Sequence, residues 1–431
     1  MIKTLLRLAR PALGPLLNRL PVRWRFAAYI RAIRCESQLP DKFVFKLAET
    51  REELEACFRL LHDAYVDAGF MKPDPSGLRA TVYHALPTTS TLLCRAGDRV
   101  VATVSLVRES AMGFPMQRIF DIAAIREAGG NIAEVSALAI DRRFRSASGR
   151  ILLPLLKFMY EYATRQFDTD HLVIAVNPRH IGFYESILCF RRLKQRPVDH
   201  YDFVNGAPAV GAHLNLNTAP TAFRRRYGRL PPEKNLYDYF TGDSLPNTQW
   251  PTKRFYTTTD PVMTPALIDH FFNQRTQAFA TLRLRELMLL HSIYDLPDYK
   301  SVLPPVPADA PRSEMRRRTH RRFSVRCPGE FSTRQLGIRR TFELTVFECS
   351  ATGFRVHSDS RLPAGSTGTV IIELGAADWS VMLVTVLRLG SQDRHIALLR
   401  IDQDDLAWRK FVGALGKAQT HDDLGEATRF V

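Results

Sequence analysis

Arginine residues gather in one short run in the C-terminal part of the chain, and their spacing suits a ligand that carries phosphate groups. The run reads RRRTHRRFSV over residues 316–325 and places Arg318 and Arg322 four residues apart, with Arg317 and Arg321 beside them. A guanidinium group can bind two phosphate oxygens at once and can stack on a planar ring, which a lysine cannot do. The run therefore predicts a site for an anionic ligand; the alternative is a solvated linker or a lipid-binding patch.

A second short motif, ECSATG at residues 348–353, follows the arginine run. Ser350 offers a hydroxyl group to a phosphate or to the edge of a base, and Glu348 offers a carboxylate that accepts hydrogen bonds. Gly353 lets the backbone turn or come close to a ligand. The run and this motif together predict one binding site, to which the run contributes the positive charge.

The N-terminal 34 residues form a basic segment that contains no acidic residue. Its charged residues are Lys3, Arg7, Arg10, Arg19, Arg23, Arg25, Arg31 and Arg34. They interrupt every apolar stretch, so the segment lacks the roughly 20 apolar residues of a membrane-spanning helix, and it has no signal-peptide core. Trp24 and Phe26 among the arginines suit an interfacial helix on anionic lipid. The alternative is a helix that packs on the main domain with its arginines outward.

The charge of the whole chain points to an anionic partner. The formal net charge is +16, while 45% hydrophobic and 24% charged residues are typical of a globular protein. The charge is compatible with several anionic partners: nucleic acid, acidic lipid, phosphorylated ligands and an acidic carrier protein. The alternative is a basic surface that serves only solubility. The six cysteines are scattered without a CxxC pair, which argues against disulfides and a structural zinc site and fits a reducing cytoplasm.

The N-terminal part of the chain alternates between strand and helix patterns. Residues 43–50 predict a strand and residues 51–68 a helix, and the runs TLLCRA and VVATVSLV predict a hairpin that turns at Gly97 and Asp98. EVSALAI at 134–140 and HLVIAV at 171–176 predict two further strands, with a helix between them that ends near Phe167. This alternation indicates an α/β or α+β fold.

The C-terminal part is different in character. Residues 263–294 predict one long helix with Thr264 as its N-cap, and the proline-rich linker LPPVPADAP at 303–311 follows it. Beyond the linker, short β-branched strands and turns, one of them at Gly329, predict an all-β barrel closed by a helix at about 403–415. The expected organisation is a basic segment at 1–38, a first domain at 39–242, a helical connector and linker at 243–310 and a barrel domain at 311–431.

The arginine run, the ECSATG motif and the barrel pattern together resemble the PilZ domain over about residues 315–415. The resemblance implies that the barrel binds cyclic diguanylate (cyclic di-GMP), with Arg317, Arg318, Arg322, Glu348, Ser350 and Gly353 as contacts. One departure is that the family usually has Asp or Asn where this chain has Glu348. A longer carboxylate can still accept hydrogen bonds from a guanine edge.

Residues 43–218 resemble the GNAT superfamily, and within it the N-acyl amino acid synthases and the related acyl-homoserine lactone synthases. The segments that carry the resemblance are AYVDAGF, RVVATVSLVRESAMGFPM, AEVSALAIDRRFRSASGRILL and NPRHIGFYESILCF. The implied fold is an α+β domain built on a mixed sheet, in which two neighbouring parallel strands separate and the pantetheine arm of an acyl donor lies between them. Here these strands would be EVSALAI and HLVIAV.

The resemblance also implies where the acyl donor binds. The donor-binding residues would be Leu138, Ala139 and Ile140 of the first separated strand and Arg145, Ser148, Gly149 and Arg150 of the loop after it. That loop would offer backbone N–H groups at a helix N-terminus to the donor phosphate. It lacks the RxxGxG pattern of coenzyme A-dependent members, which favours an acyl carrier protein over acyl-CoA as the donor. An acidic carrier protein would also suit the basic surface.

Two residues are candidates for catalysis. Glu134 stands where the relatives keep a glutamate, and we expect it to act as the general base that removes a proton from the amine. Tyr184 stands where GNAT relatives often place a tyrosine that protonates the leaving thiolate; the alternative is a packed aromatic ring. Asn177 and His180 could line the same cleft. Ala137 occupies the position of an arginine in the homoserine lactone synthases, which argues against homoserine lactone production.

The expected function is therefore that of a cyclic di-GMP-responsive N-acyltransferase, in the cytoplasm or peripheral on the inner membrane. It would join a fatty acyl group from a carrier-protein or CoA thioester to an amine such as an amino acid, with no metal and no nucleic-acid partner. The alternatives are a non-catalytic adaptor that binds cyclic di-GMP through the barrel and an acetyltransferase that acts on a protein. The acyl length, the amine, the oligomeric state and the sign of regulation stay open.

Overall fold

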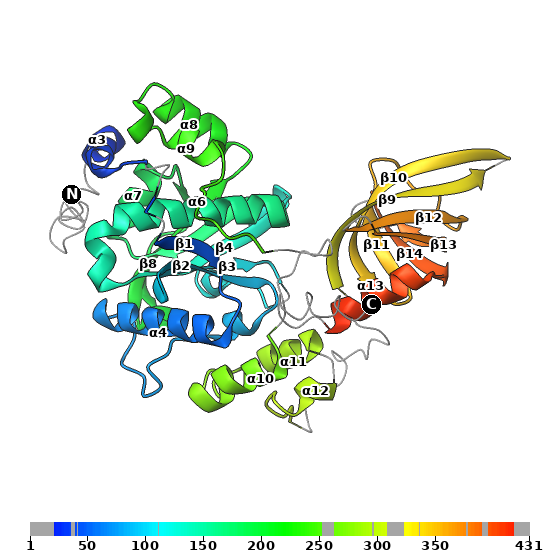
Figure 1. The fold of residues 1–431 in the computed structure, drawn as a ribbon, viewed down its shortest axis with the longest axis horizontal. Helices are drawn as coiled ribbons and strands as arrows, with labels where there is room; N and C mark the ends of the chain where they lie inside the picture. The colour runs from blue at the N-terminus through cyan, green and yellow to red at the C-terminus, as the bar shows by residue number, and fades with distance from the viewer. Residues whose placement is uncertain are drawn as a thin grey trace. The chain divides into compact units, whose positions relative to one another are not determined.

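The structure is a computed structural model that describes residues 21–35, 39–40, 42–110, 112–251, 263–294, 297–307, 323–335, 337–375, 378–389 and 395–417 (Figure 1). It divides into two units. The first contains Met1–Trp250 and Leu267–Leu282, and the second contains Pro251–Ala266 and Arg283–Val431. Each unit has a hydrophobic core of its own.

The first unit is built on one mixed sheet. Its strands are β1 (Phe43–Leu47), β2 (Thr89–Ala96), β3 (Arg99–Arg108), β4 (Asn131–Ile140), β5 (Thr169–Val176), β6 (Arg191–Arg192), β7 (Val198–Tyr201) and β8 (Ala207–Asn215). They follow the order β1-β2-β3-β4-β5-β8-β6, and β7 pairs with β8. β4 and β5 are parallel neighbours, whereas every other pair is antiparallel. The α+β fold class expected from the sequence is confirmed.

Helices cover both faces of this sheet, with α4 (Arg51–Asp67) on one face and α6 (Ser148–Phe167) on the other (Figure 1). Successive residues of a strand point to opposite faces, so on β2 Leu92 joins the main core while Leu93 packs in a small cluster with Cys57 of α4. Strands buried on both faces are mostly apolar, which agrees with β3, whose residues are all buried after Arg99. The hairpin between β2 and β3 turns at Gly97, whose φ is 60°.

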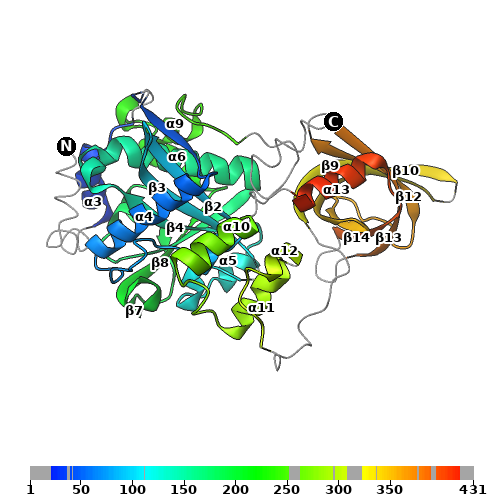
Figure 2. The ribbon, with the colours of Figure 1, turned by 60° about the horizontal axis from the view of Figure 1, so that its bottom comes forward.

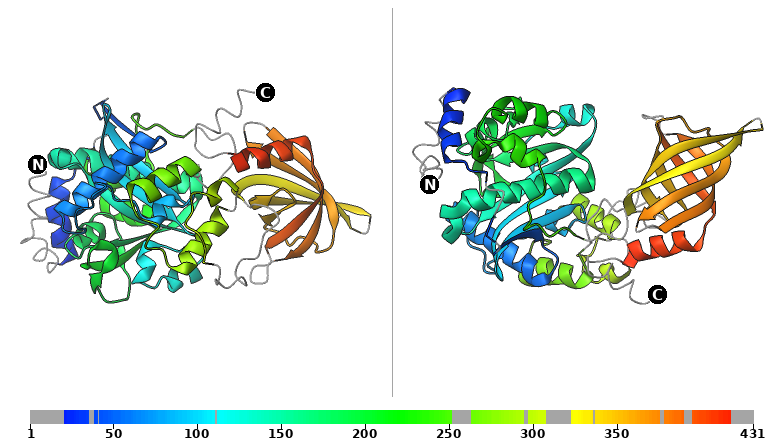
Figure 3. Two further views of the ribbon diagram at one scale, coloured as in Figure 1. Left: turned by 90° about the horizontal axis from the view of Figure 1, so that it is seen from below. Right: turned by 45° about the horizontal axis from the view of Figure 1, so that its top comes forward.

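Shorter helices complete the first unit: α3 (Val22–Ala32), α5 (Ala123–Glu127), α7 (Ile181–Ser186), α8 (Ala219–Tyr227), α9 (Leu236–Thr241) and the second half of α10 (Pro265–Ile268). α3 lies against α7 and α8 (Figure 3). The Phe26 ring is 5.5 Å from the ring of Tyr227, and the Tyr29 ring is 6.1 Å from that of Phe183. The basic N-terminal segment thus contributes one helix to the core of the first unit.

The long helix expected at 263–294 is not formed. α10 continues only as a π-helical segment at Asp269–Arg275, and α11 begins at Leu284. The break occurs because the carbonyl oxygen of Phe271 accepts hydrogen bonds from both the backbone N–H (3.1 Å) and the hydroxyl (2.7 Å) of Thr276. The Phe272 and Phe279 rings then stack at 4.9 Å across the bend. Propensity alone favours the continuous helix, and tertiary packing overrides it.

The second unit contains α11 (Leu284–Ile293), α12 (Pro297–Lys300) and a closed six-stranded barrel. The strands are β9 (Phe323–Gln335), β10 (Ile338–Ser350), β11 (Gly353–His357), β12 (Thr367–Gly375), β13 (Asp378–Leu389) and β14 (Ile396–Gln403), in the order β10-β11-β14-β13-β12-β9. The expected all-β barrel is confirmed, but Gly329 lies inside β9 and not in a turn. A Cβ atom there would meet the carbonyl oxygen of Ile371 at 2.6 Å, so the glycine permits close strand contact.

A final helix, α13 (Leu406–Lys417), closes one end of the barrel, as the sequence predicts (Figure 2). Its Trp408, Phe411 and Leu415 side chains are buried in the barrel core. The side chain of Asp405 holds the start of the helix, because its carboxylate accepts hydrogen bonds from the backbone N–H of Trp408 at 2.7 Å and the hydroxyl of Ser380 at 2.9 Å.

Candidate active site

The two parallel strands β4 and β5 separate part of the way along their length. Pairing runs from Asn131 with Thr169 to Glu134 with Val173 and stops there, although β4 continues to Ile140 and β5 to Val176. β5 keeps its pairing with β8 over the same stretch, so only the β4–β5 seam opens. The separation that the sequence resemblance implied for EVSALAI and HLVIAV is therefore present, and it begins immediately after Glu134.

A β-bulge at Ala137 and Leu138 bends β4 away from β5. β3 pairs its Ser105 with Ser136 and its Thr103 with Ala139, so two residues of β4 stand opposite the single residue Val104. Ala137 has a φ of 53°, a backbone conformation that residues with a Cβ atom rarely adopt. Such bulges re-aim the backbone where a strand borders a functional site, and here the bulge borders the opening between the strands.

The opening holds a cavity of about 440 Å³. Its walls come from α3, α4, β4, α6, β5, α7 and the β7–β8 segment, and most of the lining side chains are apolar. The polar residues that line it are Tyr29, Tyr65, Glu134, Ser136, Asn177, Arg179, His180, Tyr184 and Tyr201. An apolar cleft with a few convergent polar groups is the usual form of a small-molecule site.

Glu134 is the ionisable group at the point where the strands part. Its side chain is buried, and its carboxylate accepts a hydrogen bond of 2.9 Å from the backbone N–H of Met116. Burial raises the pKa of Glu134 to about 8, and the Met116 hydrogen bond opposes the rise. A carboxyl group whose pKa lies near neutrality can exchange protons with a reactant at physiological pH.

Tyrosine side chains surround this carboxyl group. Burial raises the pKa of Tyr201, and the nearby Glu134 charge adds to the rise. The Tyr201 hydroxyl donates to the carbonyl of Pro115 at 2.8 Å, which fixes the turn whose Met116 N–H binds Glu134. Tyr65 of α4 also lines the cavity, with the Arg79 guanidinium 4.2 Å from its ring centre. Sequence reasoning missed Tyr65 and Tyr201, because only the fold brings them to Glu134.

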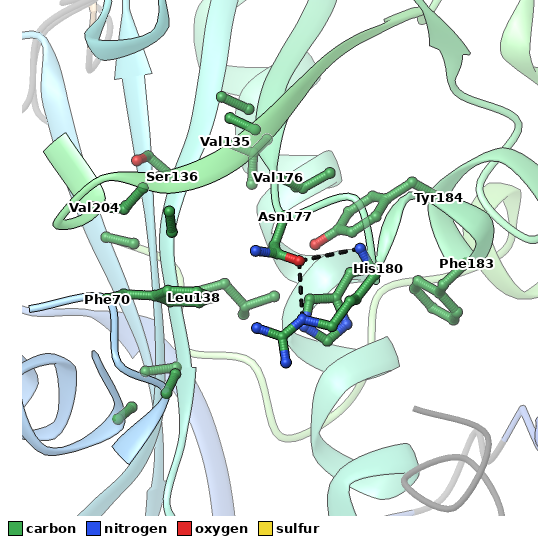
Figure 4. A pocket seen from close by; sticks show the side chains of 18 of the residues that line it. Phe70, Val135, Ser136, Leu138, Val176, Asn177, His180, Phe183, Tyr184 and Val204 are labelled. Carbon is green, nitrogen blue, oxygen red and sulfur yellow. Dashed lines mark hydrogen bonds between the residues drawn. The ribbon is translucent and has the colours of Figure 1, made fainter. Parts of the chain in front are cut away.

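Tyr184 projects from α7 into the cavity, with its hydroxyl end toward Asn177 (Figure 4). Burial raises the pKa of this tyrosine to about 12, so the phenol is protonated at neutral pH. The structure thus brings both catalytic candidates, Glu134 and Tyr184, to one cavity. The Phe190 ring packs at 5.7 Å from the Tyr184 ring and holds it in place.

Asn177 and the residues after it form the rim at the end of β5. The Asn177 side-chain oxygen accepts hydrogen bonds from the backbone N–H and the Nε of Arg179, both at 3.1 Å (Figure 4). This holds the exposed Arg179 guanidinium beside the opening. His180 also lines the cavity, as the sequence suggested, and burial lowers its pKa.

The residues expected to bind the donor fall into two groups. Leu138, Ala139 and Ile140 line the cavity. The following loop forms a short helix at Arg142–Ala147 and leads into α6 at Ser148, so a helix begins where donor phosphate binding was expected. The side chains of Arg145 and Ser148 lie outside what the structure describes, Gly149 stands in the first turn of α6, and Arg150 is exposed.

α3 supplies a wall of the cavity through Tyr29 and Ile33. Both side chains are buried, and the helix is held by an ion pair of 2.9 Å between Arg25 and Glu185 of α7. Lys234 also binds its C-terminal end, donating to the carbonyls of Ile30 at 2.9 Å and Arg31 at 3.0 Å. This wall comes from the segment that the sequence assigned to a separate basic region.

A smaller apolar pocket of about 60 Å³ adjoins the cavity. Val135 and Tyr184 line both spaces, and the small pocket lies among side chains of α6, β5, α8 and α9. Its walls include Leu156, Met159, Phe190, Phe223 and Phe240. Both spaces are largely apolar, and Glu134 lines the larger one.

The residues proposed to bind cyclic di-GMP are partly visible in the barrel. Ser350 and Gly353 face each other at the turn between β10 and β11, where the Ser350 hydroxyl donates to the Gly353 carbonyl at 2.9 Å. A Cβ atom on Gly353 would meet the carbonyl of Leu399 at 2.6 Å, so this glycine also has a packing role. Glu348 lies 3.9 Å from Arg355, a cation that the sequence did not single out.

The remaining members of that site, Arg317, Arg318 and Arg322, lie outside the described residues. Among the residues that the structure describes, no three His, Cys, Asp or Glu side chains gather as metal ligands. Within the same ranges, no helix combines the length and apolar composition needed to cross a bilayer.

Comparison with known proteins gives one family match. Residues 56–215 match the model of the family described as N-acyl amino acid synthase FeeM. No curated protein matches the chain. The matched residues contain β4, β5 and the candidates Glu134 and Tyr184.

Among solved structures, FeeM, an N-acyl amino acid synthase from uncultured soil microbes, is 27% identical over 42% of this chain and 93% of its own, with a TM-score of 0.35. The CoA-dependent acyl-homoserine lactone synthase BjaI is 18% identical over 49% of this chain and 95% of its own, with a TM-score of 0.33. A GNAT-family acetyltransferase from Staphylococcus aureus Mu50 is 15% identical over 40% of this chain and 99% of its own, with a TM-score of 0.27.

Proposed function

The chain carries an N-acyltransferase domain similar to the N-acyl amino acid synthases, and from this premise we propose that it joins a fatty acyl group to the amine of an amino acid. The donor is the phosphopantetheine thioester of an acyl carrier protein, with acyl-CoA as the alternative that the same arm would allow. The observation that carries the proposal is a buried carboxyl group, Glu134, inside an apolar cavity at the point where β4 and β5 part.

The shape of the cavity supports an acyl thioester as the donor. A pantetheine arm can enter between β4 and β5, where no strand pairing fills the seam. The acyl chain then has an apolar path through the cavity of about 440 Å³ and the pocket of about 60 Å³ behind Val135 and Tyr184. Burial of each methylene group contributes about 0.8 kcal/mol, so this path favours a long acyl chain over acetyl.

The reaction would proceed by addition and elimination at the thioester carbonyl. Glu134 as a carboxylate takes a proton from the ammonium group of the acceptor, and the amine nitrogen then forms a bond to the carbonyl carbon. The carbonyl oxygen becomes an oxyanion, for which we propose backbone N–H groups at the Ala137 bulge as hydrogen-bond donors, because the bulge interrupts the β3–β4 pairing there. The C–S bond breaks as the intermediate collapses, Tyr184 gives its proton to the thiolate, and the nitrogen loses a second proton to solvent or to the tyrosinate.

The two pKa shifts agree with these roles. A base for an ammonium group needs a pKa above that of an ordinary carboxyl group, and burial raises the pKa of Glu134 to about 8. An acid for a thiolate must be protonated at neutral pH, and burial raises the pKa of Tyr184 to about 12. Exclusion of water from an apolar cavity also strengthens the stabilisation of the oxyanion.

We further propose that the barrel binds cyclic di-GMP at the turn between β10 and β11. The arginine run at 316–325 would supply phosphate contacts, and Arg355, whose guanidinium lies 5.0 Å from the Phe347 ring centre, would add another cation beside Glu348. Ser350 keeps lone pairs for a ligand although its proton is used by Gly353. The ligand would regulate transfer or direct the enzyme to its place of action.

A peripheral position on an anionic inner-membrane surface is the third part of the proposal. Trp24 of α3 is exposed, and the Arg23 guanidinium lies 6.0 Å from its ring centre. Residues 1–20 add Lys3, Arg7, Arg10 and Arg19 without an acid. A tryptophan among arginines is typical of helices that lie at a lipid interface, and an enzyme whose product is an acylated amino acid would release it into lipid.

The decisive test is the rate of acyl transfer by Glu134→Gln. Purified full-length protein is incubated with acyl carrier protein or CoA charged with a long acyl chain and with a mixture of amino acids, and products are identified by mass spectrometry. We expect N-acyl amino acids from the wild type and a rate about 10²–10⁴-fold lower from Glu134→Gln, the usual share of general base catalysis.

Glu127→Gln is the matched control, because it makes the same chemical change on exposed helix α5. It should transfer acyl groups at the wild-type rate. Equal rates for Glu134→Gln and wild type would remove Glu134 as the base. Absence of any N-acyl product with both donors would contradict the proposed reaction itself.

A further inference from the structure

The outer face of the barrel carries an apolar half and an acidic half side by side. Four neighbouring strands, β13, β12, β9 and β10, form this face (Figure 1). Their register places Val381 opposite Ile371, Ile371 opposite Glu330 and Glu330 opposite Glu343. One row across the sheet therefore runs from two aliphatic side chains to two carboxylates.

The apolar half is a stripe along β13. Trp379, Val381, Leu383 and Leu387 are between 41% and 54% exposed, and Ile371 of β12 beside them is 38% exposed. Alternate residues of a strand point to the same face, so these side chains project outward while Ser380, Met382, Val384 and Val386 point into the barrel. A contiguous exposed stripe that includes a tryptophan marks an interaction surface in a water-exposed domain.

Two glutamates of neighbouring strands, Glu330 and Glu343, are the centre of the acidic half. Glu330 and Glu343 stand directly opposite each other, which destabilises a pair of strands. In the described ranges, Glu330, Glu343 and Asp359 form no ion pair. A groove of about 520 Å³ joins these three acids and Glu373 to the exposed Trp379 and Ile371. Positive side chains of a bound partner would relieve this repulsion.

We propose that this face binds a basic amphipathic helix of a partner protein. The apolar side of such a helix would cover Trp379, Val381 and Ile371, and lysine or arginine side chains along one edge would reach Glu330 and Glu343. The proposal concerns the barrel alone and does not depend on the proposed acyl transfer. It also differs from the turn at residues 348–353, which lies on β10 and β11 beyond this row.

The dimensions suit a helix. Neighbouring strands lie about 4.8 Å apart, so the apolar pair β13–β12 and the acidic pair β9–β10 each span roughly 5–10 Å. An α-helix with its side chains is about 10–12 Å across, so a helix centred on β12 would place its apolar side on one half and its edge over the other. A bare lipid surface fits poorly, because anionic headgroups would face four carboxylates.

The test is binding of a designed probe to the full-length protein. The probe is an 18-residue peptide of leucine and lysine whose leucines share one helical face, labelled for fluorescence anisotropy. The comparison peptide has the same composition with its leucines spread around the helix. We expect the first peptide to bind at least about tenfold more tightly, because only it presents apolar and basic sides together.

Two double variants divide the face into its halves. Glu330→Lys/Glu343→Lys and Trp379→Thr/Val381→Thr should each weaken binding by about tenfold or more, the first also removing most of the salt dependence. Asp199→Lys/Glu127→Lys makes the same charge change at exposed positions of the first unit and should leave binding unchanged. Circular dichroism and thermal unfolding confirm that each variant is folded.

Three results would overturn the proposal. Equal binding of both peptides would mean non-specific attraction to acids, and unchanged binding by both barrel variants would place the contact elsewhere. Sedimentation that shows a concentration-dependent dimer, lost in Trp379→Thr/Val381→Thr, would mean that a second copy of this chain covers the face.

Discussion

At the scale of single residues, Glu134 is a carboxyl group that the fold holds away from water. Because burial raises its pKa from an ordinary value to about 8, the folded protein binds a proton more tightly than the unfolded chain does. The contribution of Glu134 to the free energy of unfolding therefore falls as pH rises between about 4.5 and 8, and it is fully present only below that window.

The Glu134→Gln variant has no titratable group at this position, so it should lack this pH dependence of the free energy of unfolding. Relative to wild type, the variant should gain free energy of unfolding by up to about 1.4 kcal/mol for each pH unit between 5 and 8. Urea unfolding of both proteins at several pH values measures the difference. Parallel curves would show that the Glu134 carboxylate is solvated or paired in solution, and would contradict the burial on which the catalytic role rests.

At the scale of elements, the bulge in β4 lies where the strand borders the proposed reaction site. Ala137 adopts a φ of 53° because two residues of β4 share one partner on β3. Glycine tolerates this conformation, whereas a β-branched residue does not. A substitution at Ala137 should therefore preserve or abolish the bulge, depending on whether the new residue tolerates a positive φ.

We predict that Ala137→Gly keeps the bulge and the activity, and that Ala137→Val loses both. The valine should lower the free energy of unfolding by about 1–3 kcal/mol through backbone strain. If the strand straightens, backbone donors leave the oxyanion, which costs about 10²–10³-fold in kcat. Steady-state kinetics separates this from crowding of the cavity, since crowding alone would raise KM for the acyl donor and leave kcat near its wild-type value.

At the scale of the whole molecule, an N-acyltransferase unit and a barrel unit share one chain. We predict that the full-length protein binds cyclic di-GMP and that Arg322→Ala weakens binding about ten- to a hundredfold, because a charge-assisted phosphate contact is lost. Arg334→Ala, an exposed arginine on β9, is the control. Calorimetry measures the affinity, and acyl-transfer rates with and without the ligand measure coupling. Binding without a change in rate would favour a role in localisation over control of turnover.

The basic N-terminus gives a second prediction at this scale. Deleting residues 1–20 keeps α3, whose Tyr29 and Ile33 form part of the cavity wall. The truncated protein should keep its acyl-transfer activity but should not bind anionic liposomes. Liposome binding by the full chain should weaken as the salt concentration rises. Co-sedimentation with phosphatidylserine vesicles is the measurement. Equal sedimentation of both proteins would exclude a role of this segment in membrane binding.

The amino-acid sequence was enough to predict the mixed sheet, the barrel and the strand that contains Glu134. Apolar strands alternating with helices predict the mixed sheet, short strands with turns predict the barrel, and family resemblance points to Glu134 and Tyr184 within their strand and helix. Each of these features is encoded locally, in patterns of about ten residues or in motifs of adjacent residues. The same local reasoning predicted a continuous helix at 263–294, which hydrogen bonds from Thr276 to the Phe271 carbonyl interrupt.

The sequence could not predict which residues from distant parts of the chain lie together in the cavity and on the barrel. Tyr65 of α4 and Tyr201 of β7 reach the Glu134 site, and α3 becomes a wall of the cavity. The opposition of Glu330 and Glu343, and their place beside Val381, depends on strand register across the barrel. Register and side-by-side packing follow from the global fit of all buried side chains, and a shift of one residue would turn each strand over, so no local pattern can state them in advance.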